Sequence, residues 1–362
     1  MENPINYFKN IREPRIDRCK LHLFEDILFL TIAAVICGAD NFVEIEDFGK
    51  NKKEWLLTIL KLENGIPSHD TIGKLFARID PKEFESCFIA WIESVVKLTD
   101  GQVIAIDGKS LRGSASATNG QKAIHMVSAF ASANEVVLGQ LACDEKSNEI
   151  TAIPALLELI AVKGCIVTID AMGCQTSIAE KIIEQGADYI LAVKDNQKKL
   201  HKEIDQMFGR HKCETFETIE KNHGRIETRK CSIIKDLQGF DGLEKWNDLR
   251  SIVKIESKRE IKGIVSEETR CYISSLVVSA EKMNICVRTH WSIENKLHWA
   301  LDISFKEDEN RTRTDGSAEN LSIVRRVALN LLKAEKTSKS GIAAKRKSAG
   351  WNTKYLEIVL KL

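Results

Sequence analysis

The chain has 362 residues, which is long enough for a sizeable hydrophobic core and for two or three structural units. Its content of 43% hydrophobic and 29% charged residues is that of an ordinary globular protein, and its net charge of +1 indicates no particular partner. The longest apolar stretch, residues 27–37, is too short to span a bilayer, so a membrane protein is not expected.

Residues 1–98 are predicted to form an all-helical domain. Apolar residues recur at helical spacing through 23–39 and again through 81–98. Between these segments, polar residues at 68–71 can cap the start of a further helix. We expect this domain to bind DNA, and its short helices suit either a helix-turn-helix or a plain helical bundle.

A mixed α/β unit is predicted for residues 99–335. Short apolar runs alternate with helical stretches in the order strand, strand, strand, helix, strand, helix, strand. This order implies a mixed sheet that is covered by helices. The predicted strands are 102–107, 124–130, 135–142, 165–170 and 188–193, and the predicted helices are 150–164 and 176–186.

The second half of this unit contains a predicted β-rich insertion at about 200–285, where strand-like alternation is interrupted by charged and glycine-containing turns. Helical periodicity returns at about residue 284, continues through Glu294, and appears again in 316–336. The remaining residues, 336–362, are predicted to form a basic and then amphipathic tail.

Positive charge is concentrated near the carboxyl end of the chain. From Arg311 to Lys347 there are ten Lys and Arg against three Asp and Glu, so this stretch carries about +7 by subtraction. Such clustering suggests a polyanion such as nucleic acid as the partner, although many basic stretches are solvated helix faces. The residues expected to contact phosphate are Arg311, Arg313, Arg325, Arg326 and the run AAKRK at 343–347.

The ten cysteines include no Cys-x-x-Cys pair, and the first residues, MENPINYFKN, lack the pattern of a signal peptide. A disulfide framework and a zinc ribbon are therefore not expected, and the thiols should be reduced. The expected location is the cytoplasm.

Three carboxylates are candidates for catalysis. Asp107 and Asp170 each end an apolar strand and precede a turn, where side chains are held by a rigid sheet. Glu294 lies in the middle of HWSIENKLHW, an otherwise largely apolar helical segment. A single aspartate after a strand commonly caps a turn, but two matching strand ends together with an isolated glutamate favour a shared site.

Three carboxylates that share one site are typical of metal-dependent phosphoryl transfer. Two divalent ions about 3.5–4 Å apart can activate an attacking oxygen and stabilise the leaving oxygen. Three carboxylates reduce the charge of the pair from +4 to about +1, which still favours an anionic transition state. Mg²⁺ prefers hard oxygen ligands, so two Mg²⁺ ions are expected, with Mn²⁺ as a substitute.

Several motifs together resemble the H-repeat-associated (ISAs-type) DDE transposases of bacterial insertion sequences. The matching segments are IAIDGKSLRGS, VTIDAMGCQ, DYILAVKDNQ, HGRIETR, RTHWSIENKLHWALDISFKED and NLSIVRRVALNLL. The resemblance covers nearly the whole chain. It implies a ribonuclease-H-like core in which Asp107, Asp170 and Glu294 are the catalytic metal ligands. It also implies double-stranded DNA as substrate, a homodimer in the DNA complex, a nucleoid-associated protein and no nucleotide cofactor.

The sequence departs from the wider family around its glutamate. The broader signature is Tyr-x2-Arg-x3-Glu-x6-Lys, and the positions of its Tyr, Arg and Lys are here Val287, His290 and Leu301. Arg288 is the nearby candidate for the missing positive charge. The acidic pair Glu307 and Asp308 is the alternative source of a third metal ligand.

Polar residues that follow two of the predicted strands are further candidates for DNA contact. Lys109 and Arg112 come just after Asp107, and Lys194 and Gln197 come after the strand 188–193. The alternative interpretations are a solvated turn and a simple strand-to-helix connection.

Two other functions compete with a transposase that cuts element ends and joins them to a target. One is a catalytically inactive or repurposed DNA-binding protein. The other is a zinc hydrolase that uses His290, Glu294 and His298, which are spaced i, i+4, i+8 on one predicted helical stripe. That spacing differs from the His-Glu-x-x-His motif of zinc proteases, so packing is the preferred role for both histidines.

Overall fold

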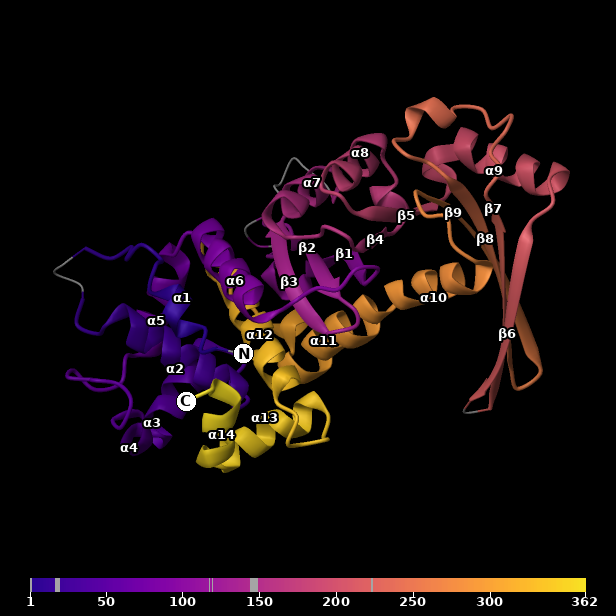
Figure 1. Cartoon of the computed structure of the whole chain (residues 1–362). Coiled ribbons are helices and arrows are strands. Elements are labelled where there is room, and N and C mark those ends of the chain that lie inside the picture. Colours follow the sequence, from indigo (N-terminus) through magenta and orange to yellow (C-terminus); the bar gives the residue numbers. More distant parts are fainter. Residues whose placement is uncertain (1, 17–19, 117, 119, 144–148, 223) are drawn as a thin grey trace.

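The computed structural model describes residues 2–16, 20–116, 118, 120–143, 149–222 and 224–362. A nine-stranded mixed sheet runs through the molecule in the order β3-β2-β1-β4-β5-β9-β8-β7-β6. Helices cover its faces, and a helical body lies at one end (Figure 1). The mixed α/β architecture predicted from the sequence is confirmed.

The first five strands are those predicted from the alternation of apolar runs. β1 lies in the middle of this group, antiparallel to β2 and parallel to β4, and β4 is parallel to β5. Parallel strands of this kind are buried on both faces, which explains their nearly continuous apolar sequence. Their bounds are β1 (Val103–Leu111), β2 (Ile124–Ala131), β3 (Val136–Ala142), β4 (Ile166–Ile169) and β5 (Asp188–Val193).

The two faces of the sheet carry different helices. Ile104 and Val167 belong to a large core that includes α7 (Glu149–Leu159) and α8 (Thr176–Glu184). Side chains that alternate with these, such as Ile166, pack in a second cluster with α10 (Ala280–His290). The helices that end the α/β unit follow α10 along the chain and are α11 (Trp299–Phe305) and α12 (Ser317–Ala334).

The predicted β-rich insertion is a four-stranded antiparallel meander. Its last strand pairs with β5, so the insertion extends the central sheet and does not form a separate one. Its far half projects from the body as a long ribbon (Figure 1). The strands are β6 (Glu214–Asn222), β7 (Arg225–Ile234), β8 (Ser251–Ile261) and β9 (Ile264–Ser274), and α9 (Lys198–Arg210) precedes them.

The amino-terminal residues form helices, as the sequence predicted. Of the capping candidates at 68–71, Ser68 is the N-cap of its helix and accepts a hydrogen bond from the Thr71 amide. The helices are α1 (Ile5–Phe8), α2 (Phe24–Ile36), α3 (Phe42–Asn51), α4 (Lys53–Leu56), α5 (His69–Arg78) and α6 (Pro81–Val95).

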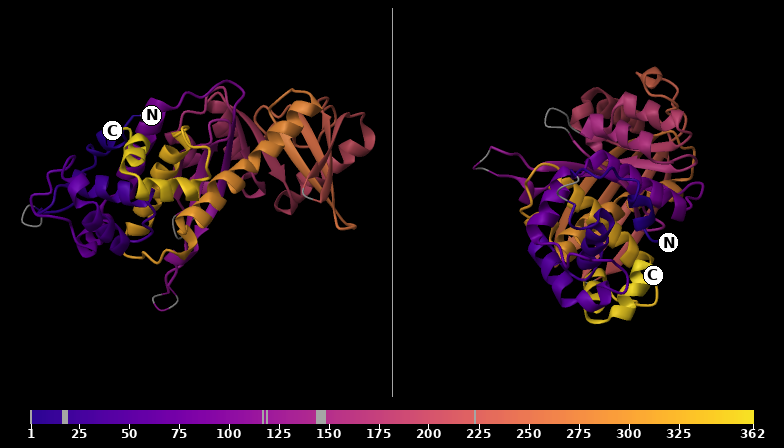
Figure 2. Two further views of the ribbon diagram at one scale, coloured as in Figure 1. Left: turned by 90° about the horizontal axis from the view of Figure 1, so that it is seen from below. Right: turned by 90° about the vertical axis from the view of Figure 1, so that its left-hand side faces the viewer.

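The carboxyl-terminal helices pack into the same helical body. α12 contacts α2, α5 and α6, and both α13 (Ile342–Trp351) and α14 (Thr353–Leu360) contact α2. Arg346 of the basic tail is buried, and its guanidinium donates hydrogen bonds to the carbonyls of Val35 and Ala39. Figure 2 shows the body and the ribbon at opposite ends of an elongated molecule, with the orange α10 running between them.

Within the described ranges, no helix has the length and apolar character that crossing a membrane requires. The nine cysteines of those ranges are all free thiols, as the absence of a Cys-x-x-Cys pair predicted.

Candidate active site

The two candidate aspartates lie on neighbouring parallel strands. Asp170 follows the last residue of β4, as predicted, but the prediction that Asp107 ends its strand is wrong, because β1 continues to Leu111 in antiparallel pairing with β2. β1 and β4 run parallel, and Ile106 pairs with Ile169. Asp107 and Asp170 are the next residues along the two strands, so they lie side by side where the β1–β4 pairing ends. Asp170 also accepts a hydrogen bond from the Met172 amide, the turn-capping contact expected of an aspartate in this position.

Glu294 shares one cavity with both aspartates. The cavity has a volume of about 420 Å³, and Asp107, Asp170 and Glu294 all line it. Glu294 begins a π-helical turn, Glu294–His298, between α10 and α11. Such turns widen a helix by one residue and often occur at functional sites, because they redirect side chains away from the regular helical stripe.

The insertion forms a second wall of this cavity. Arg270 and Tyr272 of β9 and His201 of α9 line it. The Arg270 guanidinium lies over the ring of Trp291, 4.5 Å from its centroid, and donates to the Glu268 carboxylate. Sequence analysis missed Arg270, because nothing in an alternating strand indicates which side chain faces a site built by other elements.

The negative charges in the cavity are poorly compensated. Burial raises the pKa of Asp107 to about 7, and the neighbouring charges of Asp170, Glu149 and Glu294 contribute to the rise. Burial also raises the pKa of Asp170, as does the charge of Glu149, while Lys194 opposes the rise. A bound cation would remove this electrostatic cost, so the donor set fits divalent metal ions with oxygen ligands.

Comparison with known proteins gives the family. The model described as "Transposase DDE domain" matches residues 98–331, and the model described as "DDE_Tnp_1-associated" matches residues 5–92. The chain belongs to the DDE transposase family. It is therefore an enzyme of DNA transposition, and the family implies the use of divalent metal ions.

Similar proteins are found over almost the whole length of this transposase. A putative transposase YncI of Escherichia coli O157:H7 is 43% identical over 369 residues, covering 99% of this chain and 95% of the relative. The H repeat-associated putative transposase YhhI of Escherichia coli (strain K12) is 42% identical, covering 94% and 92%. A cryo-EM structure of a piggyBac transposase synaptic complex with hairpin DNA is 10% identical, with a TM-score of 0.43, covering 98% of this chain and 76% of that one.

Of the histidines beside Glu294, His298 is buried and His290 is half-buried. His290 bonds through Nδ1 to the Thr168 hydroxyl at 3.0 Å, and His298 Nδ1 lies 3.6 Å from Asp107 Oδ2. Burial lowers the pKa of each to about 4. The π-helical turn separates His298 from the stripe that the sequence predicted. In the described ranges, no three His, Cys, Asp or Glu side chains already form a metal cage, and this holds for the carboxylates of the cavity as well as for the histidines. The zinc interpretation has no further support, because His298 does not line the cavity that holds His290 and Glu294.

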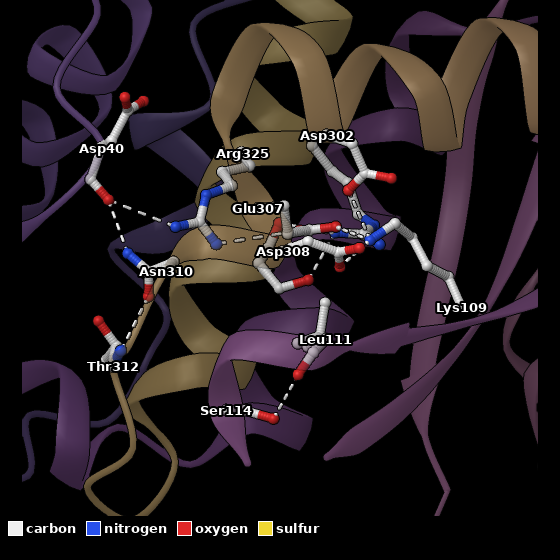
Figure 3. A network of polar contacts seen from close by, with 12 residues as sticks. Asp40, Lys109, Leu111, Ser114, Asp302, Glu307, Asp308, Asn310, Thr312 and Arg325 are labelled. Carbon is white, nitrogen blue, oxygen red and sulfur yellow. Dashed lines mark hydrogen bonds and ion pairs between the residues drawn. The ribbon is translucent and has the colours of Figure 1, made fainter. Parts of the chain in front are cut away.

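The predicted DNA contact of Lys109 is wrong. Its ammonium lies 2.8 Å from Asp302 and 2.7 Å from Asp308, and the side chain is buried (Figure 3). Lys109 follows Asp107 by two residues, so both side chains are on the same face of β1. Lys109 therefore ties the catalytic strand to the segment after α10, and it is not available to a phosphate.

Arg325 and Arg326 are also buried, which contradicts their predicted contact with the DNA backbone. Arg326 donates to Glu307 Oε1 at 2.9 Å, and Arg325 lies 3.9 Å from the same oxygen. A count of charges along the sequence cannot distinguish a buried arginine from an exposed one.

Glu307 and Asp308 do not act as the alternative third ligand. Burial alone would raise the pKa of Glu307, but the charges of Arg326, Arg325 and Lys109 outweigh it and lower that pKa. Asp308 pairs with Lys109 and, at 3.4 Å, with Arg112. Both carboxylates are thus compensated by protein cations (Figure 3).

The remaining candidates for DNA contact differ in whether their side chains are exposed or already paired within the protein. The Arg112 side chain is 82% exposed, and Lys194 and Arg311 are exposed as well. Three others already donate to protein acceptors: Gln197 to the Cys174 carbonyl, Arg313 to the Gly113 carbonyl, and Arg288 to the Glu220 carboxylate. Arg288 therefore does not reach Glu294 in place of the missing signature arginine, and Arg270 is the arginine in the cavity.

Proposed function

We propose that Asp107, Asp170 and Glu294 hold two divalent cations, Mg²⁺ in the cell, and that the transposase uses them to cut element ends and join them to a target. The observation that carries this is the convergence of the three carboxylates on one cavity from residues 63 and 124 positions apart. The strand order β3-β2-β1-β4-β5 supports a ribonuclease-H-like core, because it puts β1 beside β4.

The side chains of the cavity have distinct tasks in this mechanism. The cations, when bound, activate an attacking oxygen and stabilise the leaving oxygen of a phosphodiester. Asp107 and Asp170 would hold the cations from adjacent strands, and Glu294 would hold them from the π-helical turn. Lys194 and Arg270 supply positive charge at the cavity wall, where a DNA phosphate enters.

The proposed DNA surface extends outward from the cavity. Arg112 and Arg311 are exposed positive side chains beside the loops that follow β1 and α11. The helices of residues 1–98 are proposed to bind the element ends, and two copies of the chain to bring two ends together. Such a protein is expected to be cytoplasmic and associated with the nucleoid.

The test is to neutralise each carboxylate without changing its shape. Asp107→Asn, Asp170→Asn and Glu294→Gln should each lower end cleavage in Mg²⁺ at least about 1,000-fold, as expected when a charge that stabilises the transition state is lost. Gel-shift binding to element-end DNA should persist. The matched control is Glu281→Gln, which changes an exposed glutamate in the first turn of α10 and should leave cleavage unchanged.

Two outcomes would contradict the proposal. Normal cleavage by any one of the three variants would remove that residue from the centre. Wild-type protein that binds the DNA but shows no nicking with Mg²⁺ or Mn²⁺ would favour the inactive DNA-binding alternative.

A further inference from the structure

A fourth carboxylate lies beside the candidate active site and was not predicted from the sequence. Glu149 is the first residue of α7 and lies over Gly108, the residue that follows Asp107. A methyl group at Gly108 would overlap both the Glu149 carboxylate and the His125 ring. Glycine at this position is what lets the carboxylate rest against the backbone of the catalytic strand.

His125 holds this carboxylate in place. Glu149 Oε1 is 2.6 Å from His125 Nε2, and His125 Nδ1 is 3.0 Å from the Ser110 hydroxyl. Side-chain exposure is only 32% for His125 and 16% for Glu149, so the pair is largely shielded from water. The Ser110 hydroxyl contacts Nδ1 of His125 and the Glu149 carboxylate contacts Nε2, which is the reverse of the arrangement in a serine hydrolase triad.

Glu149 does not line the cavity itself, but its carboxylate rests against the residue next to Asp107. Its charge contributes to the raised pKa of Asp107 and to that of Asp170. On Asp107 this contribution exceeds that of Glu294. Asp107 and Gly108 point to opposite faces of β1, so Glu149 approaches the strand end from the α7 side while Glu294 approaches from the α10 side.

We propose that Glu149 is a fourth carboxylate of the metal centre and that His125 is the positioning residue that orients it. This inference rests on the proposed function of Asp107, Asp170 and Glu294. With two divalent ions, a fourth carboxylate gives the second ion a ligand on the α7 side of the sheet. A hydrogen-bonded partner such as His125 fixes the orientation of a ligand and raises metal affinity.

The experiment measures Mn²⁺ binding by the full-length protein, using electron paramagnetic resonance to count free and bound ions. Glu149→Gln should weaken Mn²⁺ binding about tenfold, in line with the loss of a ligand or its support. Gly108→Ala changes no ionisable group but displaces the carboxylate, and it should have a similar effect. The control is Glu158→Gln on the same helix, whose carboxylate is 61% exposed and pairs with Lys181 at 2.7 Å. It should bind Mn²⁺ as the wild type does.

His125→Gln separates positioning from catalysis. We expect it to raise the Mn²⁺ concentration needed for half-maximal cleavage, with kcat at saturating Mn²⁺ close to that of the wild type. Circular dichroism and thermal melting establish that each variant is folded, and Glu149→Gln keeps the test valid if Gly108→Ala does not fold. A large fall in kcat with unchanged metal dependence would overturn the positioning role.

Asp107→Asn serves as the reference variant that separates the two proposals. If Asp107→Asn loses Mn²⁺ but Glu149→Gln binds and cleaves normally, the fourth-ligand proposal is wrong and the three-carboxylate centre stands. If Asp107→Asn and Asp170→Asn both bind Mn²⁺ like the wild type, the proposed centre itself is wrong, and this inference is overturned with it.

Discussion

Asp107 and Lys109 are two residues apart on the same face of β1, yet they lie in opposite electrostatic environments. Around Asp107, burial and three neighbouring carboxylates raise the pKa to about 7. Around Lys109, the ammonium pairs with Asp302 and Asp308, and Glu307 beyond them is matched by Arg326. One strand therefore carries a region of unbalanced charge next to a region of balanced charge.

The unbalanced charge around Asp107 suits the binding of a ligand, whereas the balanced charge around Lys109 suits the stability of the fold. A buried charge that is paired and hydrogen-bonded can be kept in a fold, whereas accumulated like charge is costly unless a ligand compensates it. The balanced network also joins distant parts of the chain. Arg325 of α12 donates to the carbonyl of Asp40, which follows α2, so the network links β1 to the helical body (Figure 3).

The largest effect on stability is expected from Glu307→Gln. Removing this buried charge leaves Arg325 and Arg326 without a compensating carboxylate, and breaking such a pair costs about 3–5 kcal/mol. Urea unfolding would measure the change in free energy. Glu309→Gln, two residues away and exposed, is the control and should change stability by less than about 0.5 kcal/mol. Equal stability of the two variants would show that the network is not balanced as described.

Asp107→Asn is expected to stabilise the metal-free protein, in contrast to Glu307→Gln. The folded state raises the pKa of Asp107 from 3.8 to about 7, so it binds the proton more tightly than the unfolded state does. The contribution of Asp107 to stability is therefore full below pH 4 and is lost as the pH rises to 7. Asparagine does not titrate, so the variant should be more stable than the wild type by up to about 4 kcal/mol at pH 8 and by much less at pH 4, since a difference of three in pKa corresponds to about 4 kcal/mol.

Urea unfolding at pH 4, 6 and 8 would test this prediction. An advantage of Asp107→Asn that is independent of pH would show that the carboxyl group is not held at a raised pKa.

The smallest effect is expected from Arg112→Gln. Its guanidinium is largely exposed and is 3.4 Å from Asp308, and exposed pairs contribute about 0–1 kcal/mol to stability. If Arg112 contacts a phosphate, DNA affinity should fall similarly for all sequences, and the salt dependence of binding should decrease by about one ion. Fluorescence anisotropy at several salt concentrations measures both quantities, and an unchanged salt slope would remove Arg112 from the DNA surface.

The sequence predicted the elements whose signal is local. Strand periodicity located Asp107 and Asp170, although β1 continues for four residues past Asp107, and an isolated acid in an apolar helix located Glu294. Trp299, in the same largely apolar segment, is 61% exposed, because the preceding π-helical turn shifts the helical register. A single inserted residue in a helix leaves no mark in the hydrophobic pattern.

Properties that depend on tertiary contacts could not be predicted. Lys109, Arg325 and Arg326 were expected on a DNA surface, because clustered positive charge usually is exposed. Their acidic partners come from α11 and from the segment between α11 and α12, and no spacing rule connects these residues with β1. Glu149 was missed for the same reason, since only the packed sheet brings the start of α7 against Gly108.

The attachment of the insertion has a mechanical consequence. β9 pairs with β5 from Val193 to Ile190 through main-chain hydrogen bonds, and the same strand supplies Arg270 and Tyr272 to the cavity wall. The ribbon is thus continuous, through main-chain hydrogen bonds, with the sheet that carries Asp107 and Asp170. A displacement of the ribbon, for example by a bound partner, would therefore also move Arg270 and Tyr272 at the wall of the cavity.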